Sequence, residues 1–244
     1  MNGKLLCAGA IAGAVFTLAS SAQAQSERLR SFESPQNFAA ELRMGLYYPK
    51  IDNEFDGGAK PFEAAFGDNS RFMVGAEFDW QALRIPYVGT LGPGLGVHYL
   101  KFGRPALLRN GLPSEEETSL QIYPMHLMAV LRVDVIMRET GIPIVPYLKG
   151  GLGVALWRMS NGTGTAQVGD VPGKGISYGP QFALGGALLL DWFDEYAARQ
   201  ADQALGINNT YFYAEYVSSH LGNVNGTGLQ VGANHLSFGL TFEF

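Results

Sequence analysis

A period of two in hydrophobicity, repeated along most of the chain, is the feature that most constrains its fold. From residue 38 onward, apolar side chains occupy every second position, and charged, polar or small side chains lie between them. A strand with two unlike faces produces this pattern, because successive side chains point to opposite faces. The alternation predicts an all-β fold with eight strands, at about residues 38–48, 71–80, 89–102, 120–135, 147–157, 181–191, 211–216 and 235–244.

The composition supports strands and excludes several classes of protein. Glycine accounts for 32 of 244 residues and aromatic residues for 12%, a combination that favours many strands over a helical bundle. Lys and Arg number 17 against 22 Asp and Glu, so we expect no nucleic-acid partner. Cys7 is the only cysteine, which excludes a disulfide framework and any later cysteine-based site.

The first residues have the features of a secretory signal. Lys4 precedes an apolar stretch at residues 5–18, and small residues before Ala24 supply an A-x-A cleavage site. The sequence therefore predicts a signal peptide at residues 1–24, a periplasmic lead at 25–37 and an outer-membrane barrel domain at 38–244. Cys7 would be removed with the signal.

The predicted strands suit a membrane barrel. After the signal, no stretch reaches the roughly 20 continuous apolar residues that a spanning helix needs. A soluble barrel would show the same alternation with its apolar face inside, so the polar face must decide. That face carries many glycines beside Arg43, Arg132, Lys149 and Trp157, as the narrow interior of an eight-stranded barrel requires. We predict an eight-stranded antiparallel transmembrane up-and-down β-barrel with a packed, polar interior.

The links between strands predict its orientation. With the N-terminus in the periplasm, the long links at about 49–70, 103–119, 159–176 and 218–233 face outside. Links at 81–86 and 136–143 are shorter, as periplasmic turns are. Residues 194–205 read as a short periplasmic helix between the sixth and seventh strands, ended by Gly206. Aromatic residues near strand ends fit interfacial girdles: Tyr48, Trp80, Tyr99, Tyr123, Trp192 and Phe244.

Several runs carry a family resemblance. The segments ELRMGLYYPKID (41–52), IPIVPYLKGGLGVALW (142–157), LLLD (188–191) and GINNTYFYAEY (206–216) resemble the myxobacterial-type outer-membrane β-barrel domain family. Its members are similar to the small eight-stranded barrels of the OmpA, OmpX and OmpW type. The resemblance implies the fold and an outer-membrane location, and it implies no reaction and no catalytic residues.

The end of the chain resembles a sorting signal. Phe238, Leu240, Phe242 and Phe244 alternate up to the last residue. This pattern is similar to the C-terminal signal that the outer-membrane barrel assembly machinery recognises, which implies that machinery as a partner during biogenesis.

Charged residues on the predicted inner face are expected to pair, because a buried charge needs a partner. A pairing that fills the barrel is the structural interpretation, and a narrow ion or proton path is the functional alternative. The expected network comprises Glu41, Arg43, Glu77, Asp79, Arg132, Asp134, Lys149, Asp191, Glu215 and Glu243.

The first outer link contains a candidate calcium loop. Asp52, Glu54, Asp56 and Glu63 follow the ligand spacing of D-x-[DN]-x-[DN]-G-x₅-E, apart from Glu54 at the third position. A strand precedes the loop and Pro61 lies within it, so a solvated acidic loop is the alternative. Apart from this weak Ca²⁺ site, we expect no cofactor.

Ser218, Ser219 and His220 contain residue types of a serine hydrolase, and small lipid A deacylases place such a trio on a barrel wall. The match is superficial, because Ser precedes His and Glu215 belongs to the opposite face from Tyr216. Ser219 and His220 are the candidate catalytic residues of this alternative.

The sequence thus predicts an outer-membrane protein without an open pore and without enzymatic activity. Its outer loops would serve a structural, adhesive or surface-recognition role, and outer-membrane lipid and lipopolysaccharide would surround it. The alternatives are a lipid A-modifying hydrolase, a small conduit for apolar molecules, and a soluble periplasmic lipocalin-like barrel.

Overall fold

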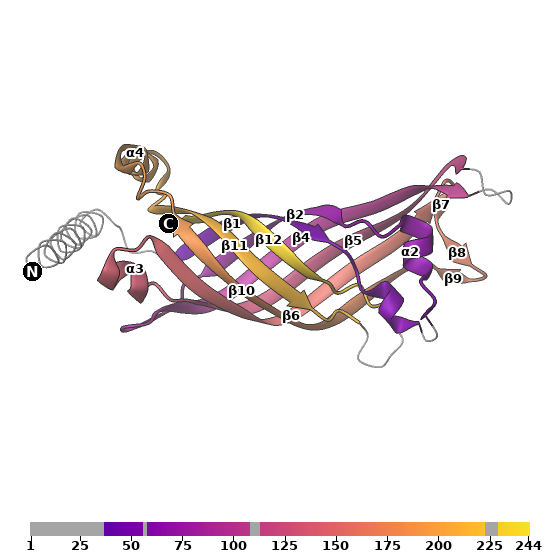
Figure 1. The fold of residues 1–244 in the computed structure, drawn as a ribbon, viewed down its shortest axis with the longest axis horizontal. Helices are drawn as coiled ribbons and strands as arrows, with labels where there is room; N and C mark the ends of the chain where they lie inside the picture. Colours follow the sequence, from indigo (N-terminus) through magenta and orange to yellow (C-terminus); the bar gives the residue numbers. More distant parts are fainter. Residues whose placement is uncertain (1–36, 56–57, 108–112, 223–228) are drawn as a thin grey trace, which may run out of the picture.

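The structure is a computed structural model that describes residues 37–244 except 56–57, 108–112 and 223–228. The predicted signal peptide and nearly all of the predicted lead therefore lie outside the described residues. Eight long strands form the body of the protein (Figure 1). They are β1 (Phe38–Tyr47), β2 (Arg71–Trp80), β4 (Gly89–Leu107), β5 (Pro113–Arg132), β6 (Ile144–Asn161), β10 (Lys174–Leu189), β11 (Asn209–Ser219) and β12 (Asn234–Glu243).

The eight strands close into a barrel. Each long strand pairs antiparallel with the next one along the chain, and β12 returns to pair with β1. That last ladder runs from Ala39 opposite Glu243 to Gly45 opposite Ser237. Phe38 and Phe244 also exchange backbone hydrogen bonds of 3.0 Å in both directions. The predicted eight-stranded antiparallel up-and-down barrel is confirmed.

The two faces of the wall have the predicted polarity. Leu42, Leu95 and Leu152 point outward and are 53%, 63% and 67% exposed. Arg43 and Lys149 point inward and are 2% and 0% exposed. The soluble lipocalin-like alternative is wrong in this respect, because such a barrel keeps its apolar face inside.

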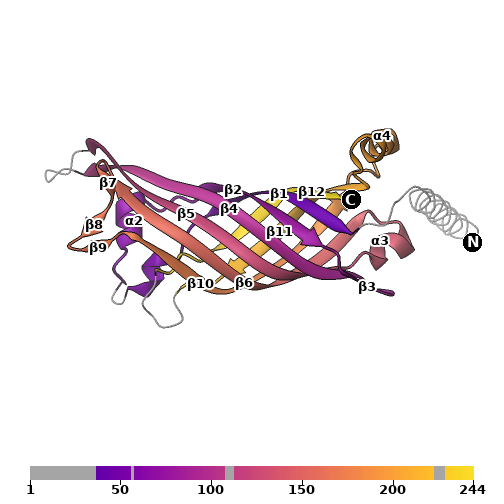
Figure 2. The same cartoon turned by 180° about the vertical axis from the view of Figure 1, so that it is seen from behind.

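Short elements gather at the two ends of the barrel (Figures 1 and 2). One end, here called the terminal end, carries Phe244 and two helices, α3 (Val135–Thr140) and α4 (Glu195–Leu205). A short strand, β3 (Leu83–Ile85), pairs with β4 there. The other end, here called the loop end, carries η1 (Ile51–Glu54), α2 (Pro61–Phe66), β7 (Gly164–Thr165), β8 (Gln167–Val168) and β9 (Val171–Pro172).

The helix predicted at residues 194–205 is confirmed as α4. The Asp194 side chain caps it by accepting hydrogen bonds from the backbone N–H groups of Tyr196 and Ala197. Gly206 ends it with a left-handed φ of 69°. No helix among the described residues is long and apolar enough to cross a bilayer.

Several predicted links prove to be structured. Residues 103–107 and 113–119 continue β4 and β5, whose ladder extends to Leu107 opposite Pro113. The link at 81–86 contains β3, the one at 136–143 contains α3, and the one at 49–70 contains η1 and α2. The alternation missed the β4 and β5 extensions because residues 113–119 (PSEEETS) are polar at every position after the proline, which gives no contrast between faces.

Glycine on the inner face lets adjacent strands and side chains approach closely. A Cβ on Gly96 would lie 2.3 Å from the His126 ring, and one on Gly239 would lie 1.8 Å from the backbone oxygen of Leu42. The second contact is with the backbone of β1, where β12 closes the barrel. Unlike a flexible side chain, this backbone cannot move aside to relieve the clash. The prediction that inner glycines make room in a narrow interior is confirmed.

We predict that Gly239→Ala lowers the free energy of unfolding by about 1–3 kcal/mol, because the added methyl group pushes β12 away from β1. Gly186→Ala is the matched control, since a Cβ at Gly186 meets nothing within 4 Å. Urea unfolding of both variants in detergent micelles measures the effect. Equal unfolding midpoints for the two variants would contradict this account of the closure.

Candidate functional site

The candidate site is a group of charges in the middle of the barrel, here called the interior charge cluster. It contains three cations and four carboxylates, contributed by β1, β2, β5, β6 and β11. Every one of these side chains is at most 4% exposed. The members are Glu41, Arg43, Glu77, Asp79, Arg132, Lys149 and Glu215.

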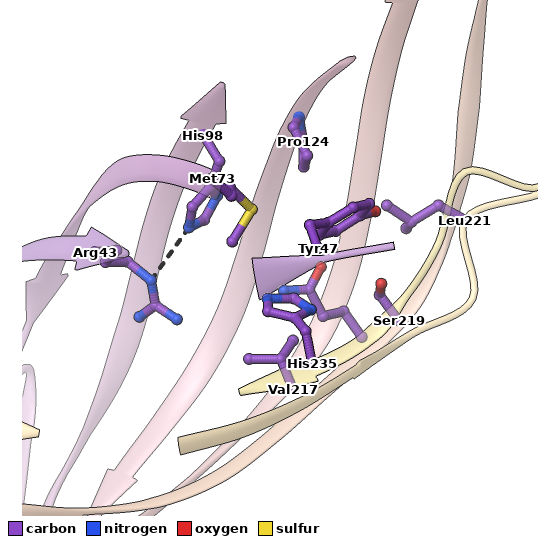
Figure 3. Close-up of a pocket in the computed structure, with 10 residues that line it drawn as sticks. Arg43, Tyr47, Met73, His98, Pro124, Val217, Ser219, Leu221 and His235 are labelled. Carbon is purple, nitrogen blue, oxygen red and sulfur yellow. Dashed lines mark hydrogen bonds between the residues drawn. The ribbon is translucent and has the colours of Figure 1, made fainter. Parts of the chain in front are cut away.

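Arg43 lies at the centre of this cluster. Its Nη1 is 2.6 Å from both Glu41 Oε2 and Glu77 Oε2, and its Nη2 pairs with Glu215 Oε1. Its Nε donates to His98 Nε2 at 3.2 Å (Figure 3). One guanidinium therefore joins β1, β2, β4 and β11, and its planar fork of donors suits this task.

Lys149 and Arg132 complete the pairing from β6 and β5. Lys149 Nζ is 2.8 Å from Glu41 Oε2 and 2.6 Å from Glu77 Oε1. Arg132 Nη2 is 2.7 Å from Glu41 Oε1 and 2.6 Å from Asp79 Oδ2. Glu41 thus contacts all three cations, which offsets the cost of removing its charge from water.

Histidine and tyrosine side chains support the ions, and sequence reasoning did not assign them to this site. His126 Nε2 lies 2.8 Å from Glu77 Oε2, and the Tyr147 hydroxyl donates to Glu215 Oε2 at 3.1 Å. The Lys149 ammonium lies 5.2 Å from the centre of the Tyr147 ring, and the Arg43 guanidinium lies 5.5 Å from that of Tyr213. All of these residues have inward parity on their strands, and this parity was the signal available in the sequence.

Three predicted members of the network lie apart from the cluster. Asp134 pairs with Arg138 at 3.4 Å, and Glu243 accepts hydrogen bonds from Gln81 at 2.7 Å and Asn209 at 3.2 Å. Asp191 accepts one from the backbone N–H of Thr210 at 3.1 Å. These carboxylates follow β5 and β10 or end β12, so they line the terminal end rather than the middle.

Burial perturbs the acids that follow the strands. It raises the pKa of Asp191 to about 6, although the hydrogen bond from Thr210 opposes the shift. Burial also raises the pKa of Asp134 above its ordinary value, against the attraction of Arg138.

The charge cluster is a poor metal site. Among the described residues, only Glu41, Glu77 and Asp79 bring three potential ligand atoms within 4.8 Å of one another. Arg43, Arg132 and Lys149 already contact these carboxylates. A metal ion would have to displace these cations, so the donor set fits internal ion pairing better than metal binding.

Side chains occupy most of the interior around Arg43. A cavity of about 10 Å³ remains beside Arg43, between Tyr47, His98 and His235 (Figure 3). Such a space is about the minimum for one water molecule. Towards the loop end, an apolar core closes the barrel, and its members include Phe62 and Phe66 of α2 packed against Phe102.

The loop between β11 and β12 contributes to the same closure. The Tyr47 hydroxyl donates to the backbone oxygen of Val231, and the backbone N–H of Lys50 donates to Gly232 at 2.8 Å. Leu221, Val231 and Ala233 are buried in this core.

The candidate calcium residues have other partners in the structure. Both Asp52 carboxylate oxygens accept backbone N–H groups at the start of α2, from Phe62 at 2.7 Å and Glu63 at 3.0 Å. Glu63 pairs with Lys60 at 2.6 Å, and Glu54 is exposed in η1. Asp56 lies outside the described residues, and calcium binding stays a prediction.

The candidate hydrolase residues point away from each other. Ser219 is buried, and its hydroxyl exchanges hydrogen bonds of 2.9 and 3.0 Å with the backbone of Ala233. His220, the next residue, is exposed, and its backbone N–H donates to Pro180. Ser218 donates to Asn234, and Glu215 belongs to the interior cluster. Ser218, Ser219, His220 and Glu215 therefore do not come together as one serine–histidine–acid site.

The residues of the predicted assembly signal share one face. Phe238, Leu240, Phe242 and Phe244 all have outward parity on or just after β12. The Phe244 ring lies 6.2 Å from that of Phe38 and 6.3 Å from that of Phe78. Three aromatic rings, from β1, β2 and the last residue, therefore pack together on the outer face at the terminal end.

Comparisons with known proteins give structural similarity only. No protein-family model matches the chain, and no curated protein matches it. The solved structures to which it is similar include several outer-membrane barrels. OprG from Pseudomonas aeruginosa is 11% identical, with a TM-score of 0.47, over 87% of this chain and 97% of that one. Neisserial surface protein A is 16% identical, with a TM-score of 0.44, over 86% and 98%. Ail from Yersinia pestis, solved with a heparin analogue, is 11% identical, with a TM-score of 0.41, over 86% and 97%.

We predict that Lys149→Met lowers the free energy of unfolding by about 3–5 kcal/mol, because it leaves buried carboxylates short of a cation. Adding Glu77→Gln should recover part of the loss. Lys101→Met is the control, since Lys101 forms an exposed pair with Glu117 and should cost less than about 1 kcal/mol. Chemical unfolding in micelles measures all three. Equal losses at Lys149 and Lys101 would show that the cluster does not stabilise the barrel.

We predict that Asp191→Asn stabilises the protein at pH 8 by roughly 1 kcal/mol. The folded pKa of about 6 exceeds the ordinary value of 3.8, so folding is penalised wherever the carboxylate is charged in the unfolded chain. The advantage of the variant should therefore disappear as the pH falls from about 6 to about 4. Unfolding midpoints across this range test the prediction, and an advantage that persists at low pH would contradict it.

Proposed function

We propose that the protein is an integral outer-membrane barrel without an open pore, with a structural, adhesive or surface-recognition role. The observation that carries this proposal is the reversed polarity of the wall. Large apolar side chains stand exposed on all eight long strands, whereas charged groups fill the interior. Exposing this apolar outer surface to water would cost free energy, whereas the hydrocarbon of a bilayer would cover it.

Aromatic groups at both ends of the wall support the proposed membrane placement. Phe38, Phe78 and Phe244 pack together at the terminal end, and Tyr99 packs on Tyr123 at 5.2 Å towards the loop end. Such aromatic groups mark the two interfaces of membrane barrels. With the predicted signal peptide and periplasmic N-terminus, the loop end would face outside. The resemblance to the myxobacterial-type family and the assembly signal agree with this proposal.

The proposed surface role rests on the extension of the barrel at its loop end. The ladder between β2 and β4 stops at Val74 opposite Tyr99, whereas β4 and β5 remain paired as far as Leu107 opposite Pro113. The free edge of β4 carries Lys101, Arg104 and Pro105, and charges and proline protect edges against strand addition. We therefore propose recognition by side chains rather than by added strands.

The geometry favours none of the alternatives. The charges buried inside the barrel argue against a conduit for apolar molecules, and Ser219 and His220 lie on opposite faces. We propose no enzymatic activity. The outer-membrane lipid, lipopolysaccharide and the assembly machinery are the proposed partners.

Single-cysteine labelling tests the location and the orientation together. The only native cysteine, Cys7, belongs to the predicted signal, so the wild-type protein should carry no thiol after export. Lys60→Cys places an exposed thiol at the loop end, and Gln203→Cys places one on α4. In intact cells, a membrane-impermeant maleimide should label Lys60→Cys only, and it should label Gln203→Cys after the outer membrane is permeabilised. Labelling of neither variant in intact cells, or of Gln203→Cys alone, would overturn the proposal.

A further inference from the structure

A row of basic and polar side chains crosses four strands towards the loop end of the barrel. Lys101 of β4 lies opposite Gln121 of β5, Gln121 opposite Arg158 of β6, and Arg158 opposite Lys174 of β10. Residues that lie opposite each other in a ladder share one face of the sheet. Tyr99 and Leu156, two positions before Lys101 and Arg158, are exposed, so this basic row faces outward.

The basic row lies directly beyond the apolar surface of the wall. On each of its four strands, the next outward residue towards the terminal end is an exposed apolar or aromatic side chain. These residues are Tyr99, Tyr123, Leu156 and Ile176. The row therefore follows the boundary at which hydrocarbon would give way to lipid headgroups.

Arg158 and Lys174 form an unfavourable pair. Side chains directly opposite in an antiparallel ladder have Cβ atoms about 4.5–5.5 Å apart, and like charges at that distance repel. Neither cation forms an ion pair or a hydrogen bond with any other described residue. Lys101, by contrast, is 3.0 Å from Glu117 and has its counter-charge within the chain.

Gln121 adds a directed donor beside this pair. Its carbonyl oxygen accepts from the Tyr123 hydroxyl at 3.4 Å, which orients the amide nitrogen away from that tyrosine. Gln121, Arg158 and Lys174 thus present N–H donors from three adjacent strands. An anion that binds all three would also relieve the repulsion between the two cations.

We propose that Gln121, Arg158 and Lys174 bind a phosphate group of a phosphorylated lipid in the outer leaflet. The acyl chains of that lipid would lie along Tyr123, Leu156 and Ile176, which are the next outward residues on the same strands towards the terminal end. This apolar surface is the reason for assigning the site to a lipid rather than to a soluble anion. The inference rests on the proposed outer-membrane location, and it adds the position and the ligand chemistry of one lipid site.

Binding of bisphosphorylated lipid A to the purified, folded protein in detergent micelles tests the proposal. We expect the Arg158→Gln, Lys174→Gln double variant to bind lipid A at least about tenfold more weakly, as the loss of charge-assisted contacts implies. The wild-type protein should bind dephosphorylated lipid A as weakly as the double variant binds lipid A. Millimolar inorganic phosphate, the soluble source of the same group, should not displace the lipid.

The control variant is Lys50→Gln, Lys60→Gln, which removes the same charge at the loop end outside the basic row and should bind normally. The single variant Arg158→Lys keeps the positive charge, so it should keep part of the affinity. If the loss of binding came from misfolding, Arg158→Lys would bind as weakly as the double variant. Equal binding by the double variant, equal binding of dephosphorylated lipid A, or displacement by inorganic phosphate would each overturn the proposal. Maleimide labelling of Lys60→Cys in cells reports the location separately, so a failure of the lipid site is distinguishable from a failure of the proposed function.

Discussion

The ion pairs between Arg43, Lys149 and the carboxylates around them are the interactions on which the rest of the structure depends. An eight-stranded barrel has too little interior space for a water-filled channel, so its inward side chains must contact one another. Arg43 joins Glu41, Glu77 and Glu215, which come from β1, β2 and β11. These contacts link strands across the interior and not only along the ladders, which favours one register for the closed wall.

The interior charge cluster lies between the terminal end and the loop end of the barrel. Ion pairs occupy the middle of the interior, and an apolar core around Phe62 and Phe102 lies towards the loop end. This arrangement is the reason for placing the proposed function on the outside of the barrel. The two surfaces that the proposals use are the extended loop end and the apolar outer wall, and the basic row lies where they meet.

Alternation was enough to predict the fold and the faces of the wall. Leu42 and Arg43 are neighbours in the chain, and the alternation predicted that the apolar Leu42 points outward and the charged Arg43 inward. The structure places them in this way. Parity does not report the height of a residue in the barrel, so Asp134, Asp191 and Glu243 were grouped with a cluster that lies in the middle. The contributions of His98 and Tyr147, and the alignment of Lys101, Gln121, Arg158 and Lys174, depend on the register between strands. Register arises from turn lengths and packing and is not visible in one strand alone.

Quenching of tryptophan fluorescence by brominated lipids tests the central claim, that the apolar face contacts hydrocarbon and the other face is sealed. Trp80 is 51% exposed on the outer face of β2, and Trp157 packs against the apolar core of the loop end. In vesicles of brominated lipid, a variant that retains only Trp80 should be strongly quenched, and one that retains only Trp157 should not. Quenching of Trp157 but not Trp80, or protein that does not associate with the vesicles, would contradict the account.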